Sequence, residues 1–303
     1  MFSDLGIVIV NLDLKEITRA CIHSLLISGA DLRQIILVDN GSQDNSVEFL
    51  REQFGPDMSI VQVEKNLGYA HGLNLGIPMA LQNGAKWLLL MNNDVEVAED
   101  FFSELEKATH SPFAIISPLI LYYDLPNQIW YGGDLLIPGT LIGLRLHKNK
   151  DVRSLRLPDL QKVDFAHGCA MLVRCDVIEK IGLFNDSSVI YAEEVDFIWR
   201  ARQAGFKVAV ANRARMWHKI SALMGKQKPR QRFLRVRNQI RFYRRFSSPI
   251  QFPIMFVFSL FRTLWISADD IWRKQTDLLS PLWKAWQLGW FSDKLNDLDA
   301  SQW

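Results

Sequence analysis

Continuous apolar runs alternate with helical patterns along the first third of the chain. The runs are rich in β-branched and aliphatic residues and span 5–10, 35–38, 59–63 and 87–91. Between them, apolar residues recur with a helical period over 14–29, 47–50 and 68–81. Strands without polar alternation are typical of parallel sheets buried on both faces. The pattern therefore predicts an α/β fold with a Rossmann-like, mainly parallel sheet flanked by helices.

The pattern is less regular between residues 110 and 165, where five prolines interrupt it. We expect strands and loops here that shape an acceptor or sugar pocket, with a turn at 131–134. Further strands are predicted over 164–174 and 207–211, and Asp176 is expected to cap a short helix after the first of them.

Three polar residues, Asn92, Asn93 and Asp94, follow the run 87–91. Ligands of an open α/β sheet bind at the carboxyl ends of its strands. A carboxylate there can hold a divalent cation, and asparagines can add oxygen ligands. Taken alone, the stretch fits a polar turn better, with Asp94 or Asn93 as a helix cap.

Two other loops at the same predicted edge carry groups suited to a nucleotide. Asp39 can accept hydrogen bonds from a pyrimidine N–H or a ribose hydroxyl. Gly68, Gly72 and Gly76 repeat along one helical face, which allows close approach of an anionic ligand or, equally, close packing of the helix. Because Asn11-Leu-Asp13 follows the first strand in place of a glycine-rich turn, a nicotinamide-dependent dehydrogenase is disfavoured.

Glu193, Glu194 and Asp196 crowd the start of another predicted helix. Negative charge is favourable at a helix N-terminus, but apolar neighbours predict that some of these acids are partly buried. Crowded, buried carboxylates are the usual setting of a general base. His218 follows the strand 207–211 and is either a metal ligand or, as its position alone favours, a surface histidine.

Charge is distributed unevenly along the chain, although the net charge is only +2. Residues 197–268 contain 16 Lys or Arg and no Asp or Glu. Such a block indicates an anionic partner: nucleic acid, a phosphorylated small molecule or a membrane surface. The three cysteines lack metal-type or paired spacing, and the N-terminus lacks a secretory pattern, so we expect a reducing, cytoplasmic environment.

In combination, these motifs resemble the inverting glycosyltransferases of family two, which have the GT-A fold, and especially their rhamnosyltransferase-like branch. The resemblance covers most of the chain. The matching segments, in order, are 38–42, 66–76, 92–94, 168–174, 181–184, 191–200, His218, 237–238 and 285–289.

The resemblance implies roles for individual residues. Asp39 would recognise the nucleobase, and Asn92 and Asp94 would occupy the positions that meet the metal and the donor diphosphate. His218 would complete the metal site. Glu194 falls where the family has a catalytic base, although the family's usual residue is Asp, so Glu193 and Asp196 stay open as bases. The residues expected to contact the donor are Asn11, Asp39, Asn66, Gly68, Asn74, Asn92 and Asn93.

The implied function is inverting transfer of a sugar, rhamnose by analogy with the branch, from a nucleoside-diphosphate sugar. Mg²⁺ or Mn²⁺ would assist, and the acceptor would be a hydroxyl of a glycan or lipid-linked glycan in cell-surface polysaccharide synthesis. The alternatives are a nucleotidyltransferase that makes sugar nucleotides and a non-catalytic sugar-nucleotide-binding or scaffold protein. A nucleotidyltransferase would need a glycine-rich, basic phosphate loop that residues 11–13 do not supply.

We expect a GT-A domain over residues 1–228, with a nucleotide-binding half (1–97) and an acceptor and catalytic half (98–228). Residues 229–303 would form a basic, aromatic helical extension. Its composition suits peripheral contact with the inner face of the cell membrane through 230–275, or a packed subdomain or homodimer interface. Pro249, Pro253 and Arg262 argue against a membrane span. No RNA-binding motif is present, and we expect no nucleic-acid partner.

Overall fold

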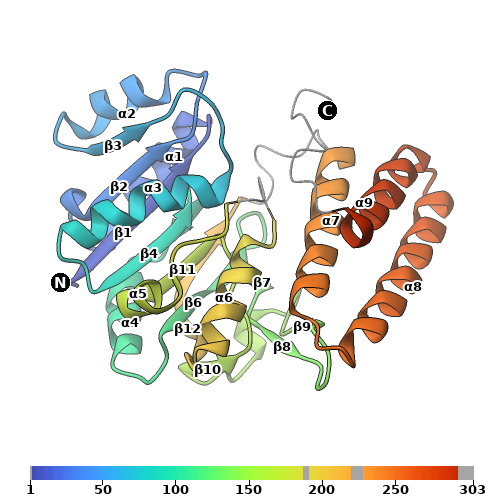
Figure 1. The fold of residues 1–303 in the computed structure, drawn as a ribbon. Helices are drawn as coiled ribbons and strands as arrows, with labels where there is room; N and C mark the ends of the chain where they lie inside the picture. The colour runs from blue at the N-terminus through green and yellow to red at the C-terminus, as the bar shows by residue number, and fades with distance from the viewer. Residues whose placement is uncertain (1, 187–190, 220–227, 293–303) are drawn as a thin grey trace.

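A computed structural model describes residues 2–186, 191–219 and 228–292 (Figure 1). Within these residues, one ten-stranded sheet has the order β10-β12-β6-β11-β4-β1-β2-β3, and β5 and β7 pair outside this path. The strands are β1 (Leu5–Asn11), β2 (Ile35–Asp39), β3 (Ser59–Gln62), β4 (Trp87–Asn92), β5 (Val95–Val97), β6 (Ile115–Tyr122), β7 (Ile129–Tyr131), β8 (Asp134–Leu136), β9 (Gly143–Arg145), β10 (Leu160–Val163), β11 (Ala170–Arg174) and β12 (Val208–His218).

Helices flank this sheet and follow it in the chain (Figure 1). The α-helices are α1 (Lys15–Ile27), α2 (Ser46–Phe54), α3 (Tyr69–Gln82), α4 (Phe101–Thr109), α5 (Cys175–Ile181), α6 (Glu193–Gln203), α7 (Lys228–Phe246), α8 (Gln251–Trp272) and α9 (Leu279–Phe291). Short 3₁₀ helices are η1 (Leu32–Gln34), η2 (Val152–Ser154) and η3 (Thr276–Leu278).

The four strands predicted in the first third are confirmed and run parallel in the order β3-β2-β1-β4. Successive residues of β1 point to opposite faces of the sheet, because side chains alternate along a strand. Val8 and Val10 join the core beneath α3, whereas Ile7 and Ile9 join the core on the α1 side. Both faces are therefore covered, which explains why β1 has no polar alternation.

The glycines of α3 serve close packing. A Cβ on Gly76 would lie 2.4 Å from Val8 Cγ1, and one on Gly72 would lie 2.8 Å from Val10 Cγ1. Since neither distance leaves room for a side chain, these two glycines set the spacing between α3 and β1. Of the two interpretations left open for the repeat, the structure supports helix packing for Gly72 and Gly76.

The second half of the chain completes the same sheet. β11 runs antiparallel to β4 and to β6, and β12 runs parallel to β6. The predicted strands at 164–174 and 207–211 correspond to β11 and to the longer β12. Asp176 is not the cap of α5: Arg174 holds that position, and Asp176 lies in the first turn with its carboxylate 2.8 Å from Arg174.

The predicted helical extension is present as α7, α8 and α9, which lie beside the α/β part (Figure 1). Arg245 of α7 is 2.7 Å from the Asp196 carboxylate of α6 and ties the extension to the sheet domain. Pro253 does not interrupt α8, because it lies in the first turn, where a helix needs no backbone donor. The boundary predicted at 228 stays a prediction, since residues 220–227 and 293–303 are outside the described residues.

Candidate active site

The candidate site lies at the carboxyl end of β4. Strand order reverses here, because β2 and β3 continue from one side of β1 while β4 lies on the other. A ligand of an open α/β sheet binds at such a reversal. Val10 of β1 pairs with Asn92 of β4, so the loops after the two strands emerge together. Asp94 lies between β4 and β5 and is not a helix cap.

Asp94 and His218 form a buried pair. His218 Nε2 lies 3.2 Å from Asp94 Oδ1, and the side chains are 8% and 15% exposed. β5 and β12 bring them together, because Val95 pairs with His218 and Lys219 N–H donates to the Asp94 carbonyl. Within the described residues, neither Asp94 Oδ1 nor His218 Nδ1 has a hydrogen-bond partner. The nitrogen that faces Asp94 Oδ1 is His218 Nε2, and an oxygen and a nitrogen this close together can serve as two ligands of one cation.

Asp94 and His218 can supply two of the ligands that a divalent cation needs, and the other ligands must come from elsewhere. Among the described residues, no group of three His, Cys, Asp or Glu side chains could hold a metal. Asn92, the third predicted ligand, ends β4 and is half-buried; its backbone N–H donates to the Cys169 carbonyl at 3.0 Å. Asp94, His218 and the neutral Asn92 therefore leave most coordination positions to ligands from outside the chain, such as diphosphate oxygens.

Asn93 turns away from Asp94 and braces the loop after β1. Its amide donates to Asn11 Oδ1 and Thr18 Oγ1, both at 2.9 Å, and the Thr18 hydroxyl donates to Asn11 Oδ1 at 2.6 Å. Asn11 is fully buried and donates in turn to Asp39 Oδ1 at 2.8 Å. Asn11 and Asn93 thus hold the site loops together, and their predicted contact with the donor stays a prediction.

Asp39 is also fully buried. Its Oδ1 accepts from the Ser42 hydroxyl as well as from Asn11, and its Oδ2 accepts from the Ser42 N–H at 3.2 Å. Both oxygens are therefore engaged by residues of the β1 and β2 ends. That a nucleobase N–H donates to Asp39 stays a prediction.

The segment before α3 is organised by Asn40. Its amide donates to Asn66 Oδ1 and to the Gly68 carbonyl, both at 3.1 Å. Gly68 has a φ of +100°, a backbone conformation that favours glycine, and it precedes the first residue of α3. Asn66 and Gly68 thus lie at the predicted edge. Asn74 instead exchanges two hydrogen bonds with the Phe184 backbone, so its predicted donor contact also stays a prediction.

Glu194 lies directly over Gly168. A Cβ on Gly168 would be 3.2 Å from Glu194 Cβ, so a side chain at this position would crowd Glu194. The next residue, Cys169, contacts Asn92 through its carbonyl, which joins the acidic cluster to the end of β4. Burial raises the pKa of Glu194, and the Asp134 charge raises it further, whereas the Arg145 charge lowers it. A carboxylate in this setting is a stronger base than an exposed one.

Glu193 is 6% exposed, and its Oε2 has no hydrogen-bond partner among the described residues. Burial, together with the charge of Glu194, raises the pKa of Glu193 well above its usual range. Asp196 differs, because it accepts hydrogen bonds from both Arg200 and Arg245 at 2.7 Å. A carboxylate whose two oxygens are each held by a guanidinium group is a structural anchor and is not free to meet an acceptor hydroxyl. The geometry therefore disfavours Asp196 as the base.

Two residues near Glu194 were not predicted from the sequence. His167 precedes Gly168, and its Nδ1 accepts from the Cys169 N–H at 3.1 Å. Burial lowers the pKa of His167 well below its usual range, so the ring is neutral and carries its proton on Nε2. Its ring centroid is 4.5 Å from that of Trp130, which lies at the same distance from His218. In the sequence, His167 is marked only by its position in the turn before the predicted apolar strand that ends at Arg174.

Arg145 is the second such residue. It comes from the β8–β9 hairpin, packs 4.8 Å from the centroid of the Tyr131 ring and lies 3.4 Å from Asp134. Its side chain is 35% exposed, so the guanidinium can meet an anionic ligand as well as Asp134. No local pattern marks Arg145, because its neighbours in space are distant in the sequence.

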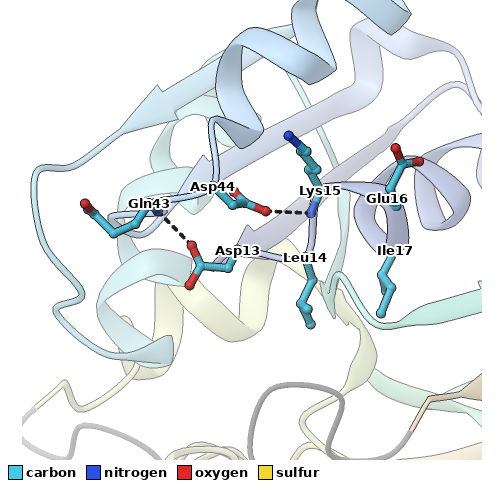
Figure 2. A pocket seen from close by; sticks show the side chains of 7 residues that line it. All are labelled: Asp13, Leu14, Lys15, Glu16, Ile17, Gln43 and Asp44. Atoms are coloured by element: carbon cyan, nitrogen blue, oxygen red, sulfur yellow. Dashed lines mark hydrogen bonds between the residues drawn. The ribbon is translucent and has the colours of Figure 1, made fainter.

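A hollow of about 580 Å³ lies between the loops after β1 and β2 (Figure 2). Its loops are cross-braced: Gln43 N–H donates to Asp13 Oδ1 at 2.7 Å, and Lys15 N–H donates to Asp44 Oδ2 at 3.0 Å. Three carboxylates line it with one ammonium group, a charge balance that does not suit a diphosphate. None of the predicted metal or catalytic residues lines this hollow.

Comparison with known proteins identifies the class of protein that this fold and site define. The family model "Glycosyl transferase family 2" matches residues 6–182, more than half of the chain, and the protein belongs to that family.

Two curated relatives extend the comparison. The chain is 29% identical over 218 residues to the low-salt glycan biosynthesis hexosyltransferase Agl10 of Haloferax volcanii, an alignment that covers 69% of this chain and 64% of the relative. It is 23% identical over 251 residues to the uncharacterized protein y4gI of Sinorhizobium fredii, covering 79% of this chain and 27% of that protein. The chain thus spans less than two thirds of the length of either relative.

Solved structures show the same fold. A mannosyltransferase from Pyrobaculum calidifontis, in complex with GDP-Man and Mn²⁺, has a TM-score of 0.58 and 11% identity, with 96% of this chain and 88% of that chain covered. GalNAc-T7 with UDP, GalNAc and Mn²⁺ also has a TM-score of 0.58, at 16% identity, with 78% and 47% covered. The predicted α/β, GT-A fold with a C-terminal helical extension is confirmed. The rhamnosyltransferase-like branch stays a prediction.

Proposed function

We propose that the protein is an inverting glycosyltransferase that moves a hexose or deoxyhexose from a nucleoside-diphosphate sugar to an acceptor hydroxyl. The observation that carries this proposal is the buried Asp94–His218 pair at the reversal point of a GT-A sheet, in which His218 Nε2 lies 3.2 Å from Asp94 Oδ1, an oxygen without a hydrogen-bond partner among the described residues. Family membership and the nucleotide-sugar complexes of structural neighbours support it.

Asp94 and His218 would hold Mg²⁺ or Mn²⁺, with Asn92 as a weak neutral partner. When bound, the cation neutralises the charge of the departing nucleoside diphosphate. Arg145, which is cationic and partly exposed beside Glu194, would add a second positive charge next to the reacting groups.

Glu194 would act as the general base. Its carboxylate takes the proton of the acceptor hydroxyl while the acceptor oxygen forms a bond to the anomeric carbon. The bond from that carbon to the diphosphate oxygen breaks on the opposite face, which inverts the configuration. Burial favours this role, because a raised pKa strengthens the base.

The acceptor is proposed to be a glycan or lipid-linked glycan in cell-surface polysaccharide synthesis. A hexosyltransferase relative named for glycan biosynthesis supports this acceptor class. Rhamnose remains the donor sugar expected from the branch resemblance, and the cytoplasm remains the expected compartment.

Release of nucleoside diphosphate from a panel of nucleotide sugars tests the proposal. We expect slow hydrolysis of one or a few donors with Mn²⁺ or Mg²⁺ and none after chelation, with Asp94→Asn as the matched inactive variant. A chain that binds these donors yet hydrolyses none of them, with or without acceptor glycans, would be a non-catalytic binding protein.

A further inference from the structure

In α8 the large apolar side chains are exposed and the small or polar ones are buried, which is the opposite of the usual arrangement in a helix that packs on a protein core. Its buried residues are small, polar or flexible: Met255, Ser259, Thr263, Ser267 and Asp270. Its large apolar side chains point outward, and they recur at helical spacing along one side. The exposed residues are Ile254 (47%), Val257 (48%), Phe261 (66%), Leu264 (47%), Trp265 (71%), Ile271 (58%) and Trp272 (79%).

Polar contacts fix this orientation. The indole N–H groups of Trp286 and Trp290 donate to Ser259 Oγ at 3.1 and 2.9 Å, and Trp283 donates to Ser267 Oγ at 3.1 Å. The buried Asp270 carboxylate accepts from Arg232 of α7 at 2.8 Å. Rotating α8 to bury its apolar face would break these bonds and leave buried polar groups unsatisfied, which is costly. The outward apolar face is therefore built into the fold.

This face is a continuous surface at the edge of the molecule. Figure 1 shows α8 on the side of α7 that lies away from the sheet. Of the described helices, α8 alone is long and apolar enough to cross a membrane, and only 17% of its most apolar window is buried. Phe291 of α9 is also 69% exposed. Exposed apolar patches of this size mark an interaction site.

Charge decides between the occupants of this face. Residues 228–292 contain 12 Lys or Arg and 3 Asp, and two of those carboxylates are already paired, Asp269 with Arg273 and Asp270 with Arg232. Arg262 is exposed on α8 beside Phe261 and Trp265. In a symmetric dimer through this face, the exposed Arg262, Arg273 and Lys274 of both copies would add like charges to one interface, which is unfavourable. At a lipid surface, long basic side chains reach the phosphates while aromatic rings enter the headgroup region.

We propose that the outward face of α8 lies in the interface of an anionic membrane. The opposite face of α8 is hydrogen-bonded to α7 and α9. The helix therefore lies along the membrane surface and does not span the bilayer. The proposal specifies the partner as lipid carrying negative headgroups, and it does not depend on the proposed transfer reaction.

Vesicle flotation tests the proposal on the full chain. We expect the protein to float with vesicles of phosphatidylcholine and phosphatidylglycerol. The fraction that floats should be smaller with phosphatidylcholine alone and smaller at high salt. The double variant Phe261→Glu/Trp265→Glu should lose at least about tenfold in partitioning, because two aromatic rings no longer enter the interface. The variant Ile27→Glu, at a position that is 57% exposed on α1, is the control and should float like the unchanged protein.

A site-specific probe separates local contact from general stickiness. The three native cysteines are buried, so a dye attached at Leu264→Cys reports α8 alone. Its emission should shift to the blue with anionic vesicles, whereas the same dye at Ile27→Cys should not respond. Circular dichroism of each variant confirms that it folds.

Three outcomes would overturn the proposal. The unchanged protein could fail to float with anionic vesicles. The Phe261→Glu/Trp265→Glu variant could float as well as its control. The unchanged protein could also form a dimer in sedimentation that this variant abolishes without any vesicle binding, which would assign the face to a second copy of the chain.

Discussion

His218 Nε2 lies 3.2 Å from Asp94 Oδ1 although the two residues are more than 120 positions apart in the chain. The antiparallel pairing of β5 with the end of β12 creates this contact. Both side chains are nearly buried, and neither Asp94 Oδ1 nor His218 Nδ1 has a hydrogen-bond partner in the part of the chain that the structure describes. In a dry setting such an arrangement is unfavourable unless a ligand satisfies it.

Asp94→Asn should weaken metal-dependent nucleotide binding by about tenfold or more, because the substitution removes the only negative charge of the pair. Calorimetry of nucleoside diphosphate with and without Mn²⁺ measures this. Asp57→Asn, at an exposed carboxylate before β3, is the control and should bind like the unchanged protein. An undiminished effect of Mn²⁺ in Asp94→Asn would remove Asp94 from the metal site.

Arg145 and Asp134 should move the acidic limb of the pH–rate profile in opposite directions. The Arg145 charge lowers the pKa of Glu194, so Arg145→Gln should shift this limb to higher pH, by up to about one unit. The Asp134 charge raises the same pKa, so Asp134→Asn should shift the limb to lower pH. The measurement is kcat/KM against pH, which reports ionisations of the free enzyme. A limb that moves in neither variant would mean that Glu194 does not control the rate.

Glu193 should destabilise the fold at neutral pH. Its pKa is raised in the folded state, so between its unfolded and folded values the native protein binds more protons than the unfolded chain. Stability contributed by protonated Glu193 is thus present at low pH and is lost as the pH rises toward the folded pKa. Glu193→Gln should raise Tm at pH 7 by about 2 °C or more and change it little near pH 4. An equal shift at both pH values would contradict this assignment.

The central strands and their parallel pairing could be predicted because burial on both faces leaves a clear mark in the sequence. The apolar runs of β1 and β4 carry that mark, and the polar residues after them predict a ligand site at the carboxyl edge of the sheet. The glycine repeat of α3 was ambiguous, since close packing and ligand approach both require a missing side chain. The structure shows close packing, because Val8 lies against Gly76 and Val10 lies against Gly72.

Other features depend on contacts between distant residues and could not be anticipated. The sequence left Asp196 open as a base because its partner Arg245 comes from a later helix, and this contact is visible only in the structure. Arg145 comes near Glu194 through a hairpin whose sequence carries no catalytic pattern. The position of Pro253 in the first turn of α8 also depends on where the helix begins, which the sequence did not define.

The central claim is that Glu194 accepts the proton of the acceptor hydroxyl. The most direct measurement is the rate of sugar transfer by Glu194→Gln, together with calorimetry of nucleotide binding to the same variant. We predict that transfer falls by about two to four orders of magnitude while nucleotide affinity is unchanged. Transfer at the unchanged rate by Glu194→Gln, with transfer lost in Glu193→Gln, would contradict the account and assign the base to Glu193.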